Sequence, residues 1–405
     1  MTSKLLGGIL LIVGTTIGAG ILALPVATAQ LGFWGSLVLL IGSWAVMTTC
    51  AFLFLEVNLW LPPNTNLISM AGATLGKFGQ LLAWTFYLLL LYSILSAYIS
   101  GGGDLFHYVL SSAGFKLSNT VSILLFTVLL GAVVYLGIRS VDYVNRGLMF
   151  GKMGAFILLV LSILPFVSMT NLSSGEFKHI IAPTSISVTV VAFTCAIIIP
   201  SLRTYFGDDV KTLRKAIFIG TLIPLLCYIA WDMVIMGVIP IEGTPGLKQI
   251  LHSATTNSDL VIALTTLLHK DTISLLAKFF TSICMATSFL SISLSLSDFL
   301  SDGLRVTKQG KGNFIIYSAT FLPPIIAVTF FPDAFIRGLS YAGISCFILM
   351  MLLPPLMVWS GRYYRALTIQ QNGVAVYQVA GGKFLLATIV FFALVMITFA
   401  LKGVI

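Results

Sequence analysis

Glycine clusters in the first apolar segment, where the residue types suit the binding of a small charged molecule. Gly14, Gly18 and Gly20 fall within seven residues, and Pro25 follows them. Both residue types weaken a helix, and a membrane protein tolerates an unwound turn where it lines a polar cavity. Freed N–H groups suit a carboxylate, and freed carbonyls suit an ammonium or a cation. The alternative is close helix packing, because Gly14 and Gly18 also match a GxxxG pattern.

A second interruption falls in the sixth apolar segment, where Pro200 follows Ile199. Paired breaks at matching places in two halves indicate a transporter site at the interface between the halves. The candidate binding residues at the two breaks are Gly14, Thr15, Thr16, Ile17, Gly18, Ala19, Gly20, Phe193, Thr194, Cys195, Ala196 and Ile197. Phe193 adjoins the break and is the candidate to stack on an aromatic substrate. Packing is the favoured role for Trp84, Tyr87, Tyr92 and Tyr98.

Acidic residues inside apolar segments are candidates for proton transfer. A carboxylate at mid-membrane depth costs roughly 2.5–3.5 kcal/mol, which invites a functional explanation. Glu56 and Asp232 are the proton-coupling candidates, and a fixed structural hydrogen bond is an equal alternative for each. For Asp104 and Asp298 we expect interfacial acids in contact with water.

Two adjacent hydroxyl residues, Thr287 and Ser288, form a possible sodium site. Sodium prefers oxygen ligands, which these side chains and the carbonyls of a broken helix could supply. Alternatively, both hydroxyls bond back to their own helix.

Patterns for other chemistries are missing from the sequence. It contains no HExxH, no GxSxG and no Cys/His cluster, and its five cysteines all lie in apolar segments. We therefore expect no catalytic residues, no metal and no cofactor. An ion channel is disfavoured, because two unlike halves with paired breaks are not typical of a pore.

Composition places most of the chain in lipid. Only 9% of the residues are charged and 58% are hydrophobic, whereas a soluble domain carries about 25% charge. The apolar runs are long and do not alternate, which predicts helices rather than barrel strands. The predicted spans are 5–31, 33–60, 80–108, 119–138, 147–169, 184–206, 215–240, 272–298, 314–331, 335–359 and 383–402.

These eleven spans suggest a first five-helix repeat at 1–170, a second at 180–360 and an eleventh helix within 361–405. The longest polar segment, 241–271, is interpreted as a connector. With the N-terminus in the cytoplasm, most of the 22 lysines and arginines fall in inside loops, Arg146 and Lys152 among them. The odd number of spans then puts the C-terminus in the periplasm. The net charge of +9 is attributed to this topology and not to nucleic-acid binding.

Taken in order, a set of motifs resembles the bacterial hydroxy and aromatic amino acid permeases, which belong to the amino acid–polyamine–organocation superfamily. The set comprises residues 14–25, Ile199-Pro200-Ser201, Leu213-Arg214-Lys215-Ala216-Ile217, Ile223-Pro224, Trp231-Asp232, Thr287-Ser288-Phe289-Leu290, Asp298-Phe299-Leu300 and Asp302-Gly303-Leu304. The similarity covers essentially the whole chain and is greatest to the tyrosine- and tryptophan-specific members.

This resemblance implies an all-α integral membrane protein with a five-plus-five inverted repeat of the leucine-transporter type, broken first and sixth helices and one extra helix. It also implies proton-coupled uptake. Residues 14–20 would hold the amino and carboxyl groups of the substrate, and the sixth-span break its side chain. The chain departs from the family at residues 194–198, where glycines are usual, so the side-chain pocket is expected to be more apolar.

We therefore expect a proton symporter for tyrosine or tryptophan that works by alternating access. The alternative is a sodium-coupled carrier or exchanger of another small amino acid or amine. The expected location is the bacterial inner membrane. The expected partners are the amino acid, protons rather than sodium, and lipid, with no nucleic acid and a monomeric state.

Overall fold

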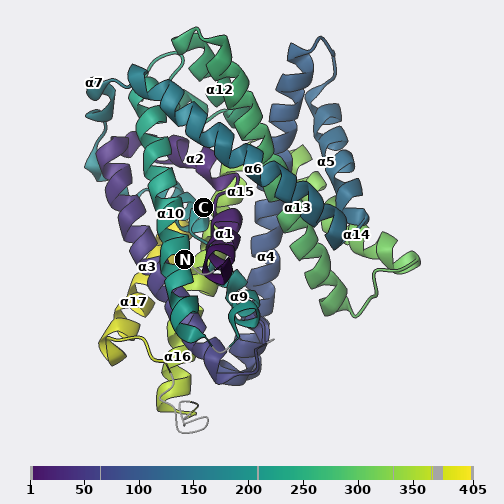
Figure 1. Cartoon of the computed structure of the whole chain (residues 1–405), viewed down its shortest axis with the longest axis vertical. Helices are drawn as coiled ribbons and strands as arrows, with labels where there is room; N and C mark the ends of the chain where they lie inside the picture. The colour runs from purple at the N-terminus through teal and green to yellow at the C-terminus, as the bar shows by residue number, and fades with distance from the viewer. Residues whose placement is uncertain are drawn as a thin grey trace.

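The computed structural model describes residues 3–63, 65–207, 209–331, 333–365, 367 and 377–402. Within these ranges the chain is a bundle of helices without a β-strand. In Figure 1 most long helices run roughly along the long axis of the molecule, with α5 and α14 on the right and α17 on the left.

The helices follow the apolar segments closely. Their bounds are α1 Ser3–Thr16, α2 Gly20–Ala27, α3 Gly32–Trp60, α4 Leu67–Ser112, α5 Asn119–Tyr135, α6 Ile138–Ile163, α7 Met169–Leu172, α8 Pro183–Ala192, α9 Ile199–Phe206, α10 Val210–Val238, α11 Leu247–Leu251, α12 Thr256–Leu268, α13 Asp271–Leu304, α14 Lys311–Phe330, α15 Ala334–Cys346, α16 Leu353–Tyr363 and α17 Gly382–Lys402. A π-helical segment, Phe347–Leu352, joins α15 to α16.

Nine helical stretches of the described chain are long and apolar enough to cross a membrane, and the bent pair α1 and α2 would make a tenth. The fourth predicted span is covered by α5, which has 17 residues. The chain is therefore an all-helical, multi-pass membrane protein. Part of the third predicted unit, 361–405, lies outside the described residues.

Two spans change direction at a glycine. The pair α1 and α2 is bent by 54° across residues 17–19. In α4, Gly76 has φ of 79°, a left-handed conformation that glycine adopts without the steric cost of a Cβ. This kink separates the first turns of α4 from the part that lines the centre of the bundle.

The two predicted halves interlock rather than forming separate globules. Helix α10 packs against α1 and α3, and α13 packs against α6 and α4. Helix α4 also packs along α15. The interior of the bundle is thus built jointly by helices from both halves, as a site at the interface between them requires.

The segment 241–271, interpreted from the sequence as a connector, contains helices α11 and α12. Apolar residues of α12, such as Leu260 and Leu264, are buried, and this helix packs on α13 and α4. The sequence interpretation missed these helices because both are too short to give a spanning signal.

Candidate functional site

The first break lies between α1 and α2, and its backbone groups leave the helical pattern. The N–H of Gly18 donates to the carbonyl of Thr16, and the N–H of Ala19 donates to Oγ of Ser288 at 2.8 Å. In a continuous helix these groups would bond to the carbonyls of Gly14 and Thr15. Those two carbonyls thus lose their helical donors at the point where the chain bends.

The second break lies between α8 and α9. The residues 193–195 are not helical, and a short 3-10 turn, Ala196–Ile198, precedes α9. Pro200 stands in the first turn of α9, where its missing N–H costs no hydrogen bond. The side chain of Thr194 lies 3.1 Å from Sγ of Cys346, which ties the break to α15. Without glycine, this break is made by an early end to α8 and a proline start to α9.

One tyrosine joins the two breaks. The hydroxyl of Tyr228, in α10, lies 2.7 Å from the carbonyl oxygen of Thr16 and 2.9 Å from that of Ala192. These carbonyls end α1 and α8, and Tyr228 is fully buried. The hydroxyl has a single proton to share between two acceptors, so it couples the geometry of one break to that of the other.

A cavity of about 360 Å³ lies between the breaks. Of the predicted binding residues, those that line it are Gly14, Thr15, Thr16, Gly18, Gly20, Thr194, Cys195 and Ile197. Four others are not part of the lining. Ile17 and Ala19 are buried and direct their backbone groups to Lys152 and Ser288, whereas Ala196 and Phe193 are buried outside the lining.

The aromatic residues of the cavity are Tyr87 and Tyr98 of α4. Phe193, the candidate chosen from the sequence, packs edge-on against Tyr228 with ring centroids 5.3 Å apart. The sequence showed that Phe193 adjoins the break, but it could not show whether the ring points into the cavity or towards Tyr228. Tyr87 and Tyr98 are eleven residues apart on one face of α4, three helical turns along the cavity wall.

Lys152, in α6, is a buried basic residue beside the first break. The residue is only 1% exposed, and its ammonium donates to the carbonyl of Ile17 at 2.6 Å. The same nitrogen lies 3.5 Å from Oγ1 of Thr287. The assignment of Lys152 to an inside loop was wrong, because α6 carries this residue into the bundle, where the broken backbone supplies an acceptor.

The hydroxyl pair Thr287 and Ser288 lies at the same place. Thr287 donates back to the carbonyl of Ile283 at 2.9 Å, and Ser288 accepts from Ala19. Both line the cavity. Two of the oxygen atoms that a sodium ion would use, the carbonyl of Ile17 and Oγ1 of Thr287, therefore lie beside Nζ of Lys152.

Asp232, in α10, is a fully buried carboxyl. Ser36 donates to its Oδ2 at 2.5 Å, and Oγ1 of Thr28 lies 3.0 Å from Oγ of Ser36 and 2.8 Å from the carbonyl of Leu24. Its Oδ1 has no hydrogen-bond partner among the described residues. A hydroxyl chain thus runs from the carboxyl to α2, the second half of the broken helix.

Glu56, in α3, is held by a bidentate ion pair with Arg362 of α16, at 2.7 and 2.6 Å. The N–H of Val379 also donates to its Oε2 at 2.8 Å. Both oxygens accept bonds from donors, which is the arrangement of a carboxylate with a structural role. Of the two alternatives for Glu56, the geometry favours the fixed structural bond.

The remaining two acids differ from each other. Asp298 is exposed and pairs with Lys308 at 2.5 Å, as an interfacial acid would. Asp104 is buried, contrary to expectation, and accepts from the backbone and side chain of Ser258 at 2.9 and 2.6 Å. Ser258 is in the first turn of α12, so Asp104 supplies the acceptor that this helix start requires.

The central cavity adjoins a second one of about 530 Å³. The two share Tyr87, Ile197, Ser201 and Ser295, and the second continues to Asn66 and Asp302. These residues belong to the start of α4, to α9 and to the end of α13. The route from the breaks therefore leads to one side of the bundle.

A membrane bundle with two interrupted helices around an internal cavity defines a membrane transport protein. The chain belongs to the tryptophan/tyrosine permease family, whose profile matches residues 1–400. The resemblance noted from the sequence is thus confirmed, and so is the interpretation as a transporter and not an enzyme.

Individual relatives cover almost the full length. The chain is 33% identical to tyrosine-specific transport system 2 of Haemophilus influenzae, over 95% of this chain and 93% of the relative. It is 31% identical to the tryptophan-specific transport protein of the same organism, over 96% and 94%. It is also 29% identical to glutamine transporter 2 of Aliivibrio fischeri, over 98% and 99%.

Proposed function

We propose that this protein is a proton-coupled symporter that carries tyrosine or tryptophan into the cell by alternating access. The observation that carries the proposal is the cavity between the two breaks, where unwound backbone meets the aromatic side chains of Tyr87 and Tyr98. The names of the relatives with 33% and 31% identity support an aromatic substrate.

In this proposal the first break binds the polar end of the substrate. The carbonyls of Gly14 and Thr15, freed of helical donors, accept from the α-ammonium, and the N–H that opens α2 at Gly20 faces the carboxylate. The aromatic side chain lies towards Thr194, Ile197 and α4. A cavity of about 360 Å³ lies within the range of small-molecule sites.

Lys152 supports coupling to protons over sodium. Its ammonium donates to Ile17 and approaches Thr287, so a positive charge stands where these oxygens would bind sodium. A second cation at this distance would be repelled strongly in a poorly solvated interior. Sodium coupling remains the alternative and requires that Lys152 be neutral or move away.

Asp232 is the proposed proton carrier. Among the described residues no cation pairs with Asp232, and its Oδ1 has no hydrogen-bond partner. A carboxylate buried in this way is costly in its ionised form, so the carboxyl is expected to hold its proton in this state. Ser36 and Thr28 connect it to α2. Losing the proton would leave a buried negative charge that accepts more strongly from Ser36, and this would change the bonding along the hydroxyl chain to the broken helix.

Alternating access is proposed from the route that leads from the cavity past Tyr87 to Asp302. With the N-terminus in the cytoplasm, this side is cytoplasmic and the state is inward-facing. The proposal includes eleven spans in two inverted five-helix repeats, 1–170 and 180–360, followed by a last helix that brings the C-terminus to the periplasm. It places a monomer in the lipid of a bacterial inner membrane.

Glutamine transporter 2, at 29% identity, supports a second candidate substrate, a small polar amino acid. Serine hydroxyls at positions 288, 291 and 295 line the cavity and could bond to an amide. The test is uptake of labelled tyrosine, tryptophan and glutamine into proteoliposomes under an inward proton gradient. We expect accumulation of an aromatic amino acid that a protonophore abolishes. Equal uptake with the gradient collapsed and sodium present would refute proton coupling.

A further inference from the structure

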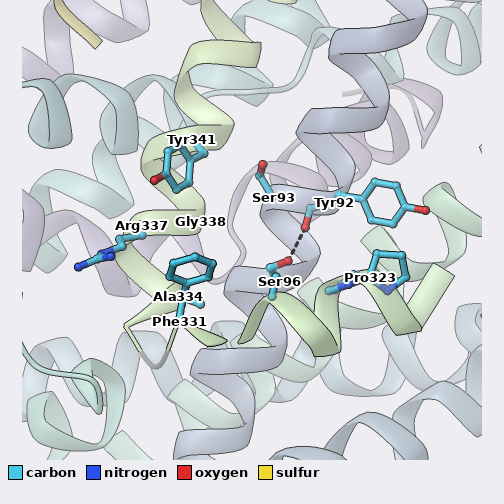
Figure 2. Close-up of a pocket in the computed structure, with 11 residues that line it drawn as sticks. Tyr92, Ser93, Ser96, Pro323, Phe331, Ala334, Arg337, Gly338 and Tyr341 are labelled. Carbon is cyan, nitrogen blue, oxygen red and sulfur yellow. Dashed lines mark hydrogen bonds between the residues drawn. The ribbon is translucent and has the colours of Figure 1, made fainter. Parts of the chain in front are cut away.

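A separate cavity of about 380 Å³ lies between α4, α14 and α15 (Figure 2). It shares no lining residue with the substrate cavity. Ser93 and Ser96 line this cavity, whereas Ile94 and Tyr98 line the substrate cavity. Helix α4 is therefore the common wall between the two.

The sequence explains why a space opens here. Pro323 and Pro324 interrupt the hydrogen bonding of α14. Pro323 has no N–H for the carbonyl of Ala319, and the hydroxyl of Tyr92 donates to that carbonyl at 2.7 Å instead. Ala327 on α14 is a small residue that leaves this space unfilled. Gly338 on α15 instead allows a close approach to α4, because a Cβ there would lie 2.8 Å from the carbonyl oxygen of Ser93.

The mouth of this cavity faces the membrane. Phe331 lines the cavity and is exposed, and its α14 neighbours Leu322, Ile326 and Phe330 are exposed apolar residues as well. In a chain that spans a membrane, such a surface is covered by lipid tails. Any occupant that enters from this side comes from the lipid phase.

Among the described residues that line the cavity, the one charged side chain is at its edge. Arg337, in the first turn of α15, borders the cavity, and its guanidinium points away from Ser96 and out of the apolar space in Figure 2. Its Nε donates to Asp333 at 2.6 Å, which leaves the Nη groups uncommitted to that carboxylate. Guanidinium Nη groups suit a phosphate, and a nearby carboxylate suits an ammonium.

We propose that this cavity is a phospholipid site, in which an acyl chain fills the space between α4, α14 and α15 and a zwitterionic headgroup meets Arg337 and Asp333. The occupant packs against the face of α4 that is opposite the substrate. It fills the space that α14 leaves beside α4 and α15, and thereby supports the wall that carries Tyr98.

The test is native mass spectrometry of the full-length protein, purified in mild detergent with phosphatidylethanolamine. The wild type is expected to retain one phospholipid. Ala327→Phe, which fills the cavity, is expected to lose it, and Ala45→Phe, which adds the same ring on an exposed face of α3, is expected to keep it. Equal retention by the wild type and Ala327→Phe would overturn the proposal.

A second measurement does not depend on the folding of a variant. A phospholipid with a photoreactive group near the end of its acyl chain is added to the wild-type protein in nanodiscs, and labelled peptides are mapped. Labelling of Ser93 to Ser96 and of the segment around Ala327 is expected. Labelling confined to other surfaces, or competition by tyrosine or tryptophan at these peptides, would contradict a lipid occupant.

Discussion

The ammonium of Lys152 donates a 2.6 Å hydrogen bond to the carbonyl oxygen of Ile17, inside the break of the first spanning helix. The bond links α6 to the unwound backbone, and Lys152 is only 1% exposed. A hydrogen bond from a charged donor is worth about 1.5–3 kcal/mol, and an unpaired buried acceptor carries its own penalty. Lys152 therefore stabilises the broken conformation directly.

Lys152→Met is expected to lower uptake at least about tenfold, because about 1.4 kcal/mol corresponds to a factor of ten and the carbonyl of Ile17 loses its donor. Lys152→Arg keeps a charge and a donor and should retain part of the activity. Initial uptake rates in proteoliposomes, normalised to protein in the membrane, measure the effect. Wild-type rates in the methionine variant would show that the ammonium has no part in transport.

Asp232→Asn is expected to abolish accumulation against a gradient while leaving exchange of internal for external substrate. The amide keeps the size of the carboxyl but cannot carry a proton. Asp271→Asn is the control, since Asp271 is exposed at the start of α13 and lines neither cavity. Ser36→Ala should reduce accumulation less than Asp232→Asn. Full accumulation by Asp232→Asn would move the proton site elsewhere.

Gly18→Ala is expected to reduce transport strongly. A Cβ at Gly18 would lie 2.5 Å from Oγ of Ser288, the atom that accepts from Ala19. The double variant with Ser288→Ala should recover part of the loss, because the clashing oxygen is gone. Gly154→Ala, where a Cβ meets nothing within 4 Å, is the control. If Gly18→Ala and Gly154→Ala were equally active, close approach at the break would not matter.

Glu56→Gln is expected to lower the thermal unfolding temperature of the detergent-solubilised protein. The side chains of Glu56 and Arg362 are 0% and 8% exposed, and breaking a buried ion pair costs about 3–5 kcal/mol. Replacing both residues by methionine should recover much of the stability, since no buried charge is left unpaired. A double variant less stable than Glu56→Gln would indicate that the pair itself stabilises the fold.

The positions of the breaks could be predicted because they depend on local backbone chemistry. Gly14, Gly18 and Gly20 weaken the first spanning helix, and Pro200 marks the start of α9. The apolar segments likewise predicted the helices, since lipid leaves the backbone few alternatives. Periodicity alone was not enough for α11 and α12, which are shorter than a membrane is thick.

The contacts across the site could not be predicted, because they join residues far apart in the chain. Tyr228 meets Thr16 and Ala192 only after α10 packs against both breaks. Asp104 finds its donors in Ser258, 154 positions away. Counting charges placed Lys152 in a loop. Its long side chain instead donates to the carbonyl of Ile17, which is free to accept because the helix is broken there.

The central claim is that the two breaks bind the transported amino acid. The most direct measurement is an experimental structure of the protein with bound tyrosine or tryptophan. The account predicts the amino and carboxyl groups within hydrogen-bonding distance of backbone atoms of residues 14–20, with the ring between Thr194 and α4. An amino acid bound elsewhere, with the cavity between the breaks empty, would contradict it.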